Sequence, residues 1–102
     1  MTIEDAIRRV AELRAQLPSI KEEGGYGHRF GKVFINDGMV QRGLEPCPHC
    51  GGAIGMGLIV VRHDDGRMVG FNPRLGHYVQ EGHPITCEDV DGETLIAILA
   101  DA

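Results

Sequence analysis

The sequence predicts an α+β fold with one N-terminal helix, a small antiparallel sheet of short strands and one short C-terminal helix. Three observations predict it: helical spacing of apolar residues over 2–17, short β-branched segments divided by glycine-rich turns over 32–87, and a capped apolar segment over 92–101. Helices that lie at the two ends of an antiparallel sheet are typical of this class. The length of 102 residues fits one domain, 1–102.

Residues 2–17 are predicted to form an amphipathic helix that begins at a capping box. Thr2 is a suitable N-cap, and Asp5 lies three residues on, where its carboxylate can reach back to the cap. The apolar positions recur at helical spacing and share one face: Ile3, Ala6, Ile7, Val10, Leu13 and Leu17. Arg14 falls within this apolar arc, where we expect its stem to pack and its guanidinium to reach water. Pro18 ends the helix.

Before the cysteines, the sequence predicts a glycine-rich connection followed by a hairpin. The connection covers 21–31, and KVFI at 32–35 has the composition of a short strand. NDG at 36–38 is a strong turn signal, so 39–44 is expected to be the returning strand.

A second hairpin is predicted after the first two cysteines. GLIVVRH at 57–63 is rich in β-branched residues, DDG at 64–66 is a turn signal, and RMVGF at 67–71 is expected to return. HYV at 77–79 is expected to be a further strand.

The C-terminal segment 92–101 is predicted to be a helix. Asp91 can cap it, and Glu93 suits the positive end of the helix dipole. Its apolar residues are clustered so that they can pack inward: Leu95, Ile96, Ile98 and Leu99.

The composition narrows the classes of function. Ten basic and fifteen acidic residues give a net charge of −5, which argues against nucleic acid as a partner, because phosphate binding needs a basic surface. The N-terminus lacks the apolar run of a signal peptide, and no apolar stretch approaches the length of a membrane span. We therefore expect a cytoplasmic protein. Three cysteines are an odd number, which favours reduced thiols that bind a metal over a disulfide scaffold.

The segment EPCPHCGG at 45–52 carries the most specific chemical signal. Pro-His between two cysteines is similar to the redox pair of strongly oxidising enzymes of the thioredoxin superfamily. Such a pair needs a helix after the second cysteine, since the helix dipole lowers the thiol pKa. GGAIGMG follows instead, and each glycine disfavours a helix by about 1 kcal/mol relative to alanine. The sequence therefore favours a metal site over a redox dithiol.

A structural zinc site requires two further ligands from elsewhere in the chain. Cys87 is the remaining cysteine, and His83 lies four residues before it. The predicted ligands are Cys47, Cys50, His83 and Cys87, with His77 as an alternative to His83. Such a Cys3His set is closed and tetrahedral. The alternative without a metal is two surface thiols and an unrelated, buried Cys87.

The segment LEPCPHCGG, residues 44–52, resembles the first knuckle of small zinc-ribbon proteins, among them the phage restriction-alleviation family of the Lar type. The matching positions are Leu44, Pro46, Cys47, Pro48, Cys50, Gly51 and Gly52. Where that family has a second Cys-x-x-Cys pair, this chain offers His83 and Cys87. The resemblance implies a zinc-ribbon-like β region over 32–87. It also implies a small phage-encoded protein directed against a host defence system.

These observations lead to the expectation of a non-enzymatic protein-interaction or inhibitory module with a structural zinc ion and a protein partner. A second hypothesis is an enzyme, either a thiol-disulfide oxidoreductase that uses the Cys-x-x-Cys pair or a zinc-dependent hydrolase with Glu81 or Glu88 as base. A third is a zinc ribbon that binds nucleic acid.

Overall fold

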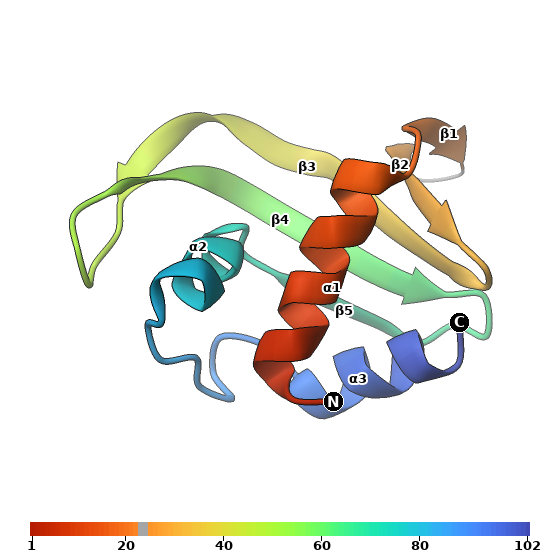
Figure 1. Ribbon diagram of the computed structural model, residues 1–102. Helices are drawn as coiled ribbons and strands as arrows, with labels where there is room; N and C mark the ends of the chain where they lie inside the picture. Colours follow the sequence, from red (N-terminus) through yellow and green to blue (C-terminus); the bar gives the residue numbers. More distant parts are fainter. Residues whose placement is uncertain (23–24) are drawn as a thin grey trace.

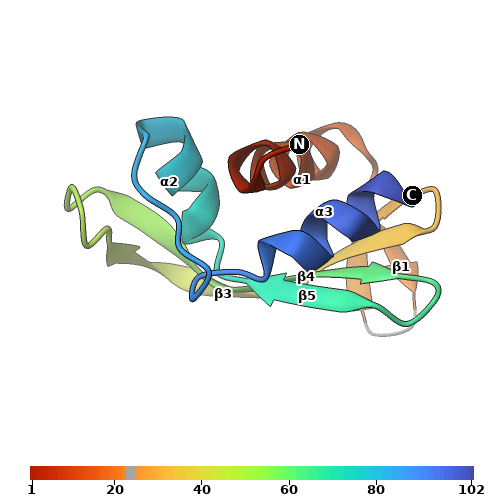
Figure 2. The same cartoon turned by 90° about the horizontal axis from the view of Figure 1, so that it is seen from below.

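The fold was derived from a computed structural model, which describes residues 1–22 and 25–102, without the side chains of 37–43 and 56. It confirms the α+β class: within the described residues, a sheet of five antiparallel strands in the order β1-β2-β3-β4-β5 carries three helices on one face (Figures 1 and 2). The elements in chain order are α1 (Ile3–Gln16), β1 (Ile20–Glu22), β2 (Gly25–Phe30), β3 (Val33–Pro46), β4 (Ala53–His63), β5 (Met68–Phe71), α2 (Arg74–Glu81) and α3 (Gly92–Ala100). None of the described helices has the length and apolar character needed to span a membrane.

The N-terminal helix α1 confirms the predicted capping box. The hydroxyl of Thr2 accepts the amide hydrogen of Asp5 at 3.1 Å, and the Asp5 carboxylate accepts that of Thr2 at 3.3 Å. Leu17 has extended backbone angles and Pro18 follows it, so the helix stops one residue short of the predicted end. Four of the six residues of the predicted apolar face are buried, namely Ala6, Ile7, Val10 and Leu13, and Ile3 and Leu17 are partly buried.

The predicted connection at 21–31 is wrong, because most of it forms the hairpin of β1 and β2. The sequence signal for strand β2 was the alternation of larger side chains with small or polar ones in GYGHRF. His28 is buried beneath the end of α1, where its Nδ1 lies 3.0 Å from the carbonyl oxygen of Leu17. Gly27 is required beside β3, since a Cβ there would lie 2.1 Å from the carbonyl oxygen of Ile35.

The predicted turn at 36–38 is also wrong, because β3 continues through this segment to Pro46. Asn36 pairs with Val60 and Met39 with Leu58, so β3 has one more residue than β4 between these two pairs. The extra residue is accommodated as a bulge within one long strand. Pairing with β4 along its whole length overrides the local turn signal and makes β3 and β4 a long hairpin (Figure 1).

The second predicted hairpin is confirmed, and its first strand is longer than expected. β4 begins at Ala53, and the DDG turn at 64–66 connects it to β5. Gly66 has a φ of +103°, which glycine adopts without a side-chain clash, and its amide donates to the carbonyl of His63 at 3.0 Å.

The predicted strand at 77–79 is wrong, because this segment lies within helix α2. Local signals for a helix flank it. The Asn72 side chain accepts the amide hydrogen of Arg74 at 2.9 Å, and Pro73 has helix-compatible backbone angles. At the other end Gly82 adopts a left-handed conformation with φ of 74°, and the amide of His83 donates to the carbonyl of Tyr78 at 2.8 Å.

The C-terminal helix α3 is confirmed. Asp91 caps it, and its carboxylate accepts the amide hydrogen of Thr94 at 3.2 Å. The hydrogen bond from the Thr94 hydroxyl, together with that from the Thr94 amide, lowers the pKa of Asp91. Leu95 and Ile98 are fully buried, and α3 packs on α1, β4 and β5.

The two faces of the sheet are buried in different ways. The helices cover one face and enclose the core (Figure 2). Phe34 alternates along β3 with the core residues Val33 and Ile35, so its side chain lies on the opposite face of the sheet. It is also fully buried, although no described helix covers that face (Figure 2). Its ring lies between the guanidinium groups of Arg29 and Arg62, which are its cross-strand neighbours, at 5.4 Å from each. Arg29 is held there by ion pairs with Glu22 and Asp64.

Candidate metal centre

The first two cysteines lie on the tight turn that joins β3 to β4. The last pair of the hairpin is Pro46 with Ala53. Beyond it the amide of Cys47 donates to the carbonyl of Gly52 at 2.8 Å, and the amide of Gly51 donates to the carbonyl of Cys47 at 2.8 Å. Gly51 has a φ of 73°, which a side chain would disfavour. The glycine after the second cysteine therefore closes the turn.

Two histidines reach this turn from α2 and from the residue that follows its cap. His77 lies within α2, and His83 directly follows the C-cap Gly82. The hydrogen bond from the His83 amide to the Tyr78 carbonyl folds the chain back at the helix end. The helix and its cap thus place both imidazoles on the side of the β3–β4 turn.

The side chains of these four residues converge. The ligand atoms of Cys47, Cys50, His77 and His83 all lie within 4.8 Å of one another. Within this group, Sγ of Cys50 lies 3.3 Å from Nε2 of His77. Zinc–ligand bonds of about 2.0–2.3 Å place tetrahedral ligand atoms about 3.3–3.8 Å apart. Side-chain adjustments of about 1 Å therefore suffice for all four atoms to bind one zinc ion.

His83 provides a second, independent indication of a metal. Its Nε2 is buried and has no hydrogen-bond partner among the described residues. A buried polar atom without a partner costs about 1–3 kcal/mol. His83 belongs to the Cys/His group, and coordination of a metal through this nitrogen would remove the cost.

The environment of Cys47 favours its thiolate, which is the form that binds metal. Burial acts most strongly and opposes ionisation, but hydrogen bonds from the amides of His49 and Cys50, a side-chain hydrogen bond with Cys50 and the charge of Arg74 outweigh it. Together they lower the pKa of Cys47. Amide groups that point at the first sulfur are what the knuckle geometry requires.

Aromatic contacts fix the position of His83. Its ring centroid lies 5.0 Å from that of His49 and 5.7 Å from that of Tyr78, which is buried. His49 also meets Tyr78 edge to face at 4.9 Å. His49 is exposed and is not a member of the four-residue group.

The group differs from the predicted ligand set in one member. Cys47, Cys50 and His83 are brought together as expected, and His77 joins them in addition to His83 rather than in its place. Cys87 is exposed, in a turn on the way to α3, and is not part of the group. The group is therefore Cys2His2 instead of Cys3His. The sequence signals that could have placed His77 in the site are Asn72-Pro73 and Gly82. They delimit a helix at 74–81, and this helix carries His77.

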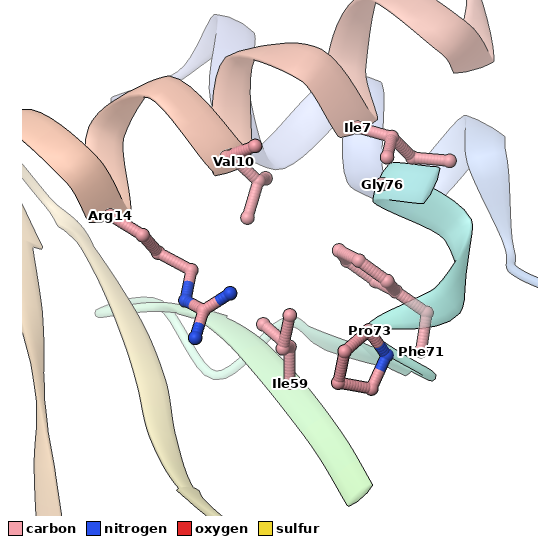
Figure 3. A pocket seen from close by; sticks show the side chains of 8 residues that line it. Ile7, Val10, Arg14, Ile59, Phe71, Pro73 and Gly76 are labelled. Carbon is pink, nitrogen blue, oxygen red and sulfur yellow. The ribbon is translucent and has the colours of Figure 1, made fainter. Parts of the chain in front are cut away.

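The pocket shown in Figure 3 lies between α1, β4, β5 and the start of α2, and none of the four converging Cys and His residues lines it. It is lined by Ile7, Val10, Ala11, Arg14, Ile59, Phe71, Pro73 and Gly76. Its volume is about 30 Å³, which is room for about one or two water molecules. The cavity is too small for an organic substrate.

Residues 47–52 form the turn between β3 and β4, and residues 44–46 are the end of β3. Comparison of the chain with protein-family models, curated proteins and solved structures found no match. Among the described residues, the Cys/His group is the feature that supports a proposal about function.

Proposed function

We propose that this protein is a non-enzymatic protein-binding module whose structural zinc ion is held by Cys47, Cys50, His77 and His83. The observation that carries the proposal is the convergence of these four donors within 4.8 Å, with the Nε2 atom of His83 buried and otherwise unpartnered. Two thiolates and two imidazoles are a common donor set for structural zinc. In this arrangement the metal joins the end of the β3–β4 hairpin to α2.

Four protein ligands favour a structural over a catalytic metal. A hydrolytic zinc site keeps one coordination position open for water, with three protein ligands. Here four side chains fill a tetrahedral site. The proposal therefore disfavours the zinc-dependent hydrolase.

The position of the Cys-x-x-Cys pair disfavours the thiol-disulfide oxidoreductase. In such enzymes the first cysteine begins a helix, whose dipole stabilises the thiolate. Here the pair lies on a turn between two strands, and Ala53 begins β4 two residues after Gly51. His77 and His83 also lie beside the sulfurs, which suits coordination of a metal.

Exposed apolar residues next to the knuckle support a protein partner. Leu44 is 70% exposed near the end of the hairpin, and Pro46, Pro48 and Ala53 are exposed beside it. Apolar side chains that gather at an exposed site are typical of protein contact surfaces. The resemblance of residues 44–52 to restriction-alleviation proteins points to an inhibitory role against a host defence system, and the net charge of −5 disfavours nucleic acid.

A surface variant tests the proposal without touching the metal. We expect Leu44→Glu to keep one zinc per chain and an unchanged unfolding midpoint, because Leu44 is exposed. On an affinity column, the variant should lose the partner that the unaltered chain retains. Glu93→Gln, an exposed change in α3, serves as the control and keeps the partner. A chain that binds no zinc, or whose partner is retained equally by Leu44→Glu, would contradict the proposal.

A further inference from the structure

The two cysteines of the knuckle differ in exposure although they belong to one site. Cys50 is exposed, whereas Cys47 is 2% exposed. A small solute therefore reaches the sulfur of Cys50 first. The sulfur of Cys47 is next to it, since the side chains of the two residues hydrogen bond and their ligand atoms lie within 4.8 Å.

We propose that oxidation of Cys47 and Cys50 releases the zinc ion. A peroxide converts the two thiolates into a disulfide, and zinc dissociates. The inference rests on the proposed function, because zinc must first be bound by this pair. In this inference oxidation regulates the zinc site, because loss of zinc would separate the end of the β3–β4 hairpin from α2.

The reaction balances with a peroxide as the two-electron oxidant. The Cys50 thiolate attacks one oxygen of hydrogen peroxide, the O–O bond breaks, and the second oxygen leaves as hydroxide and takes up a proton. The resulting sulfenic acid is attacked by the Cys47 thiolate, so that the S–S bond forms and the S–O bond breaks. The second hydroxide also leaves as water. Two thiolates, one peroxide and two protons give one disulfide and two waters.

The consequence for the fold follows from the division of the ligands. A disulfide removes both sulfur ligands, and His77 and His83 remain as the only two members of the group. Two imidazoles do not complete a four-coordinate zinc site, so the metal dissociates. His77 belongs to α2, and Cys47 and Cys50 belong to the hairpin turn, so the metal-mediated link between these elements is lost with it.

The experiment uses the zinc-loaded full chain with Cys87→Ser, because Cys87 is a further exposed thiol that peroxide can attack. Hydrogen peroxide is added in small excess, and a colorimetric zinc chelator and thiol counting follow the reaction. We expect one zinc to be released for every two thiols lost and the mass of the chain to fall by two hydrogens. A dithiol reductant with added zinc should reverse the change. Hydrogen exchange should rise in residues 74–83 while α1 keeps its protection.

Two outcomes would overturn the inference alone: zinc that stays bound while peroxide is consumed, or zinc that is released with each cysteine oxidised separately to sulfinic acid. A chain that holds no zinc before peroxide is added would overturn the proposed function and the inference with it. The metal content at the start therefore separates the two failures. The test keeps both Cys47 and Cys50, so the loss of folding expected for Cys50→Ser does not affect the result.

Discussion

Replacement of Cys50 by serine is expected to abolish zinc binding and to lower the thermal unfolding midpoint by at least about 20 °C. Structural zinc supplies on the order of 10 kcal/mol to the folding of small metal-binding domains. This is comparable with the whole stability of a domain of this size, about 5–15 kcal/mol. Elemental analysis of the purified variant and thermal unfolding by circular dichroism measure the two effects.

Cys87→Ser is the matched control for this change. Cys87 is exposed and lies outside the four-residue group, so the same substitution should keep one zinc per chain. Its effect on stability should remain within about 0.5 kcal/mol, as is usual for surface positions. If Cys87→Ser lost zinc and Cys50→Ser kept it, the assignment of the ligands would be wrong.

Phe34→Ala is expected to destabilise the protein by about 3–5 kcal/mol, as is typical for removal of a buried aromatic side chain. The ring is fully buried on the face of the sheet that the helices leave open, and the guanidinium groups of Arg29 and Arg62 cover it. The substitution removes apolar burial and two cation–π contacts together. Urea unfolding of the two proteins under zinc-saturating conditions measures the difference.

Met68→Ala serves as the comparison, because Met68 lies opposite Arg62 on β5 and is 62% exposed. It should change the free energy of unfolding by no more than about 0.5 kcal/mol. A loss below about 1 kcal/mol for Phe34→Ala would show that the arginines do not enclose the ring in solution.

Elements whose signals are local were predicted well from the sequence. The N-terminal helix has its capping box at Thr2 and Asp5 and its stop at Pro18. The DDG turn at 64–66 joins two strands with clear β-branched composition. The C-terminal helix has Asp91 as its cap. In each case residues within one or two turns of chain determine the structure, so short patterns suffice.

Elements that depend on long-range pairing were predicted less well. The segment at 36–38 has the composition of a turn, yet pairing of β3 with β4 on both sides of it accommodates the extra residue as a bulge. The strand β2 is rich in glycine, which usually indicates a loop, but Gly27 is needed for close approach to Ile35. The strand predicted at 77–79 was an error of a different kind. The residues that delimit helix α2, Asn72-Pro73 before it and Gly82 after it, are local signals that were present in the sequence.

The four side chains that converge in the structure include three of the four residues that the sequence proposed as ligands, together with His77, which it offered as an alternative. The knuckle of Cys47 and Cys50 has a specific local pattern, and His83 and His77 were both considered as ligands. Sequence spacing alone favoured Cys87, because it is the remaining cysteine of the chain and lies four residues after His83. The fold brings in His77 instead, since α2 directs its side chain toward Cys50, 3.3 Å away.

X-ray absorption spectroscopy at the zinc edge of the loaded protein tests the ligand assignment most directly. A site made of Cys47, Cys50, His77 and His83 predicts two sulfur ligands at about 2.3 Å and two nitrogen ligands at about 2.0–2.1 Å. The spectrum should be unchanged in Cys87→Ser. Three sulfur ligands, one of them lost in Cys87→Ser, would contradict the Cys2His2 site and restore the Cys3His set that the sequence spacing predicts.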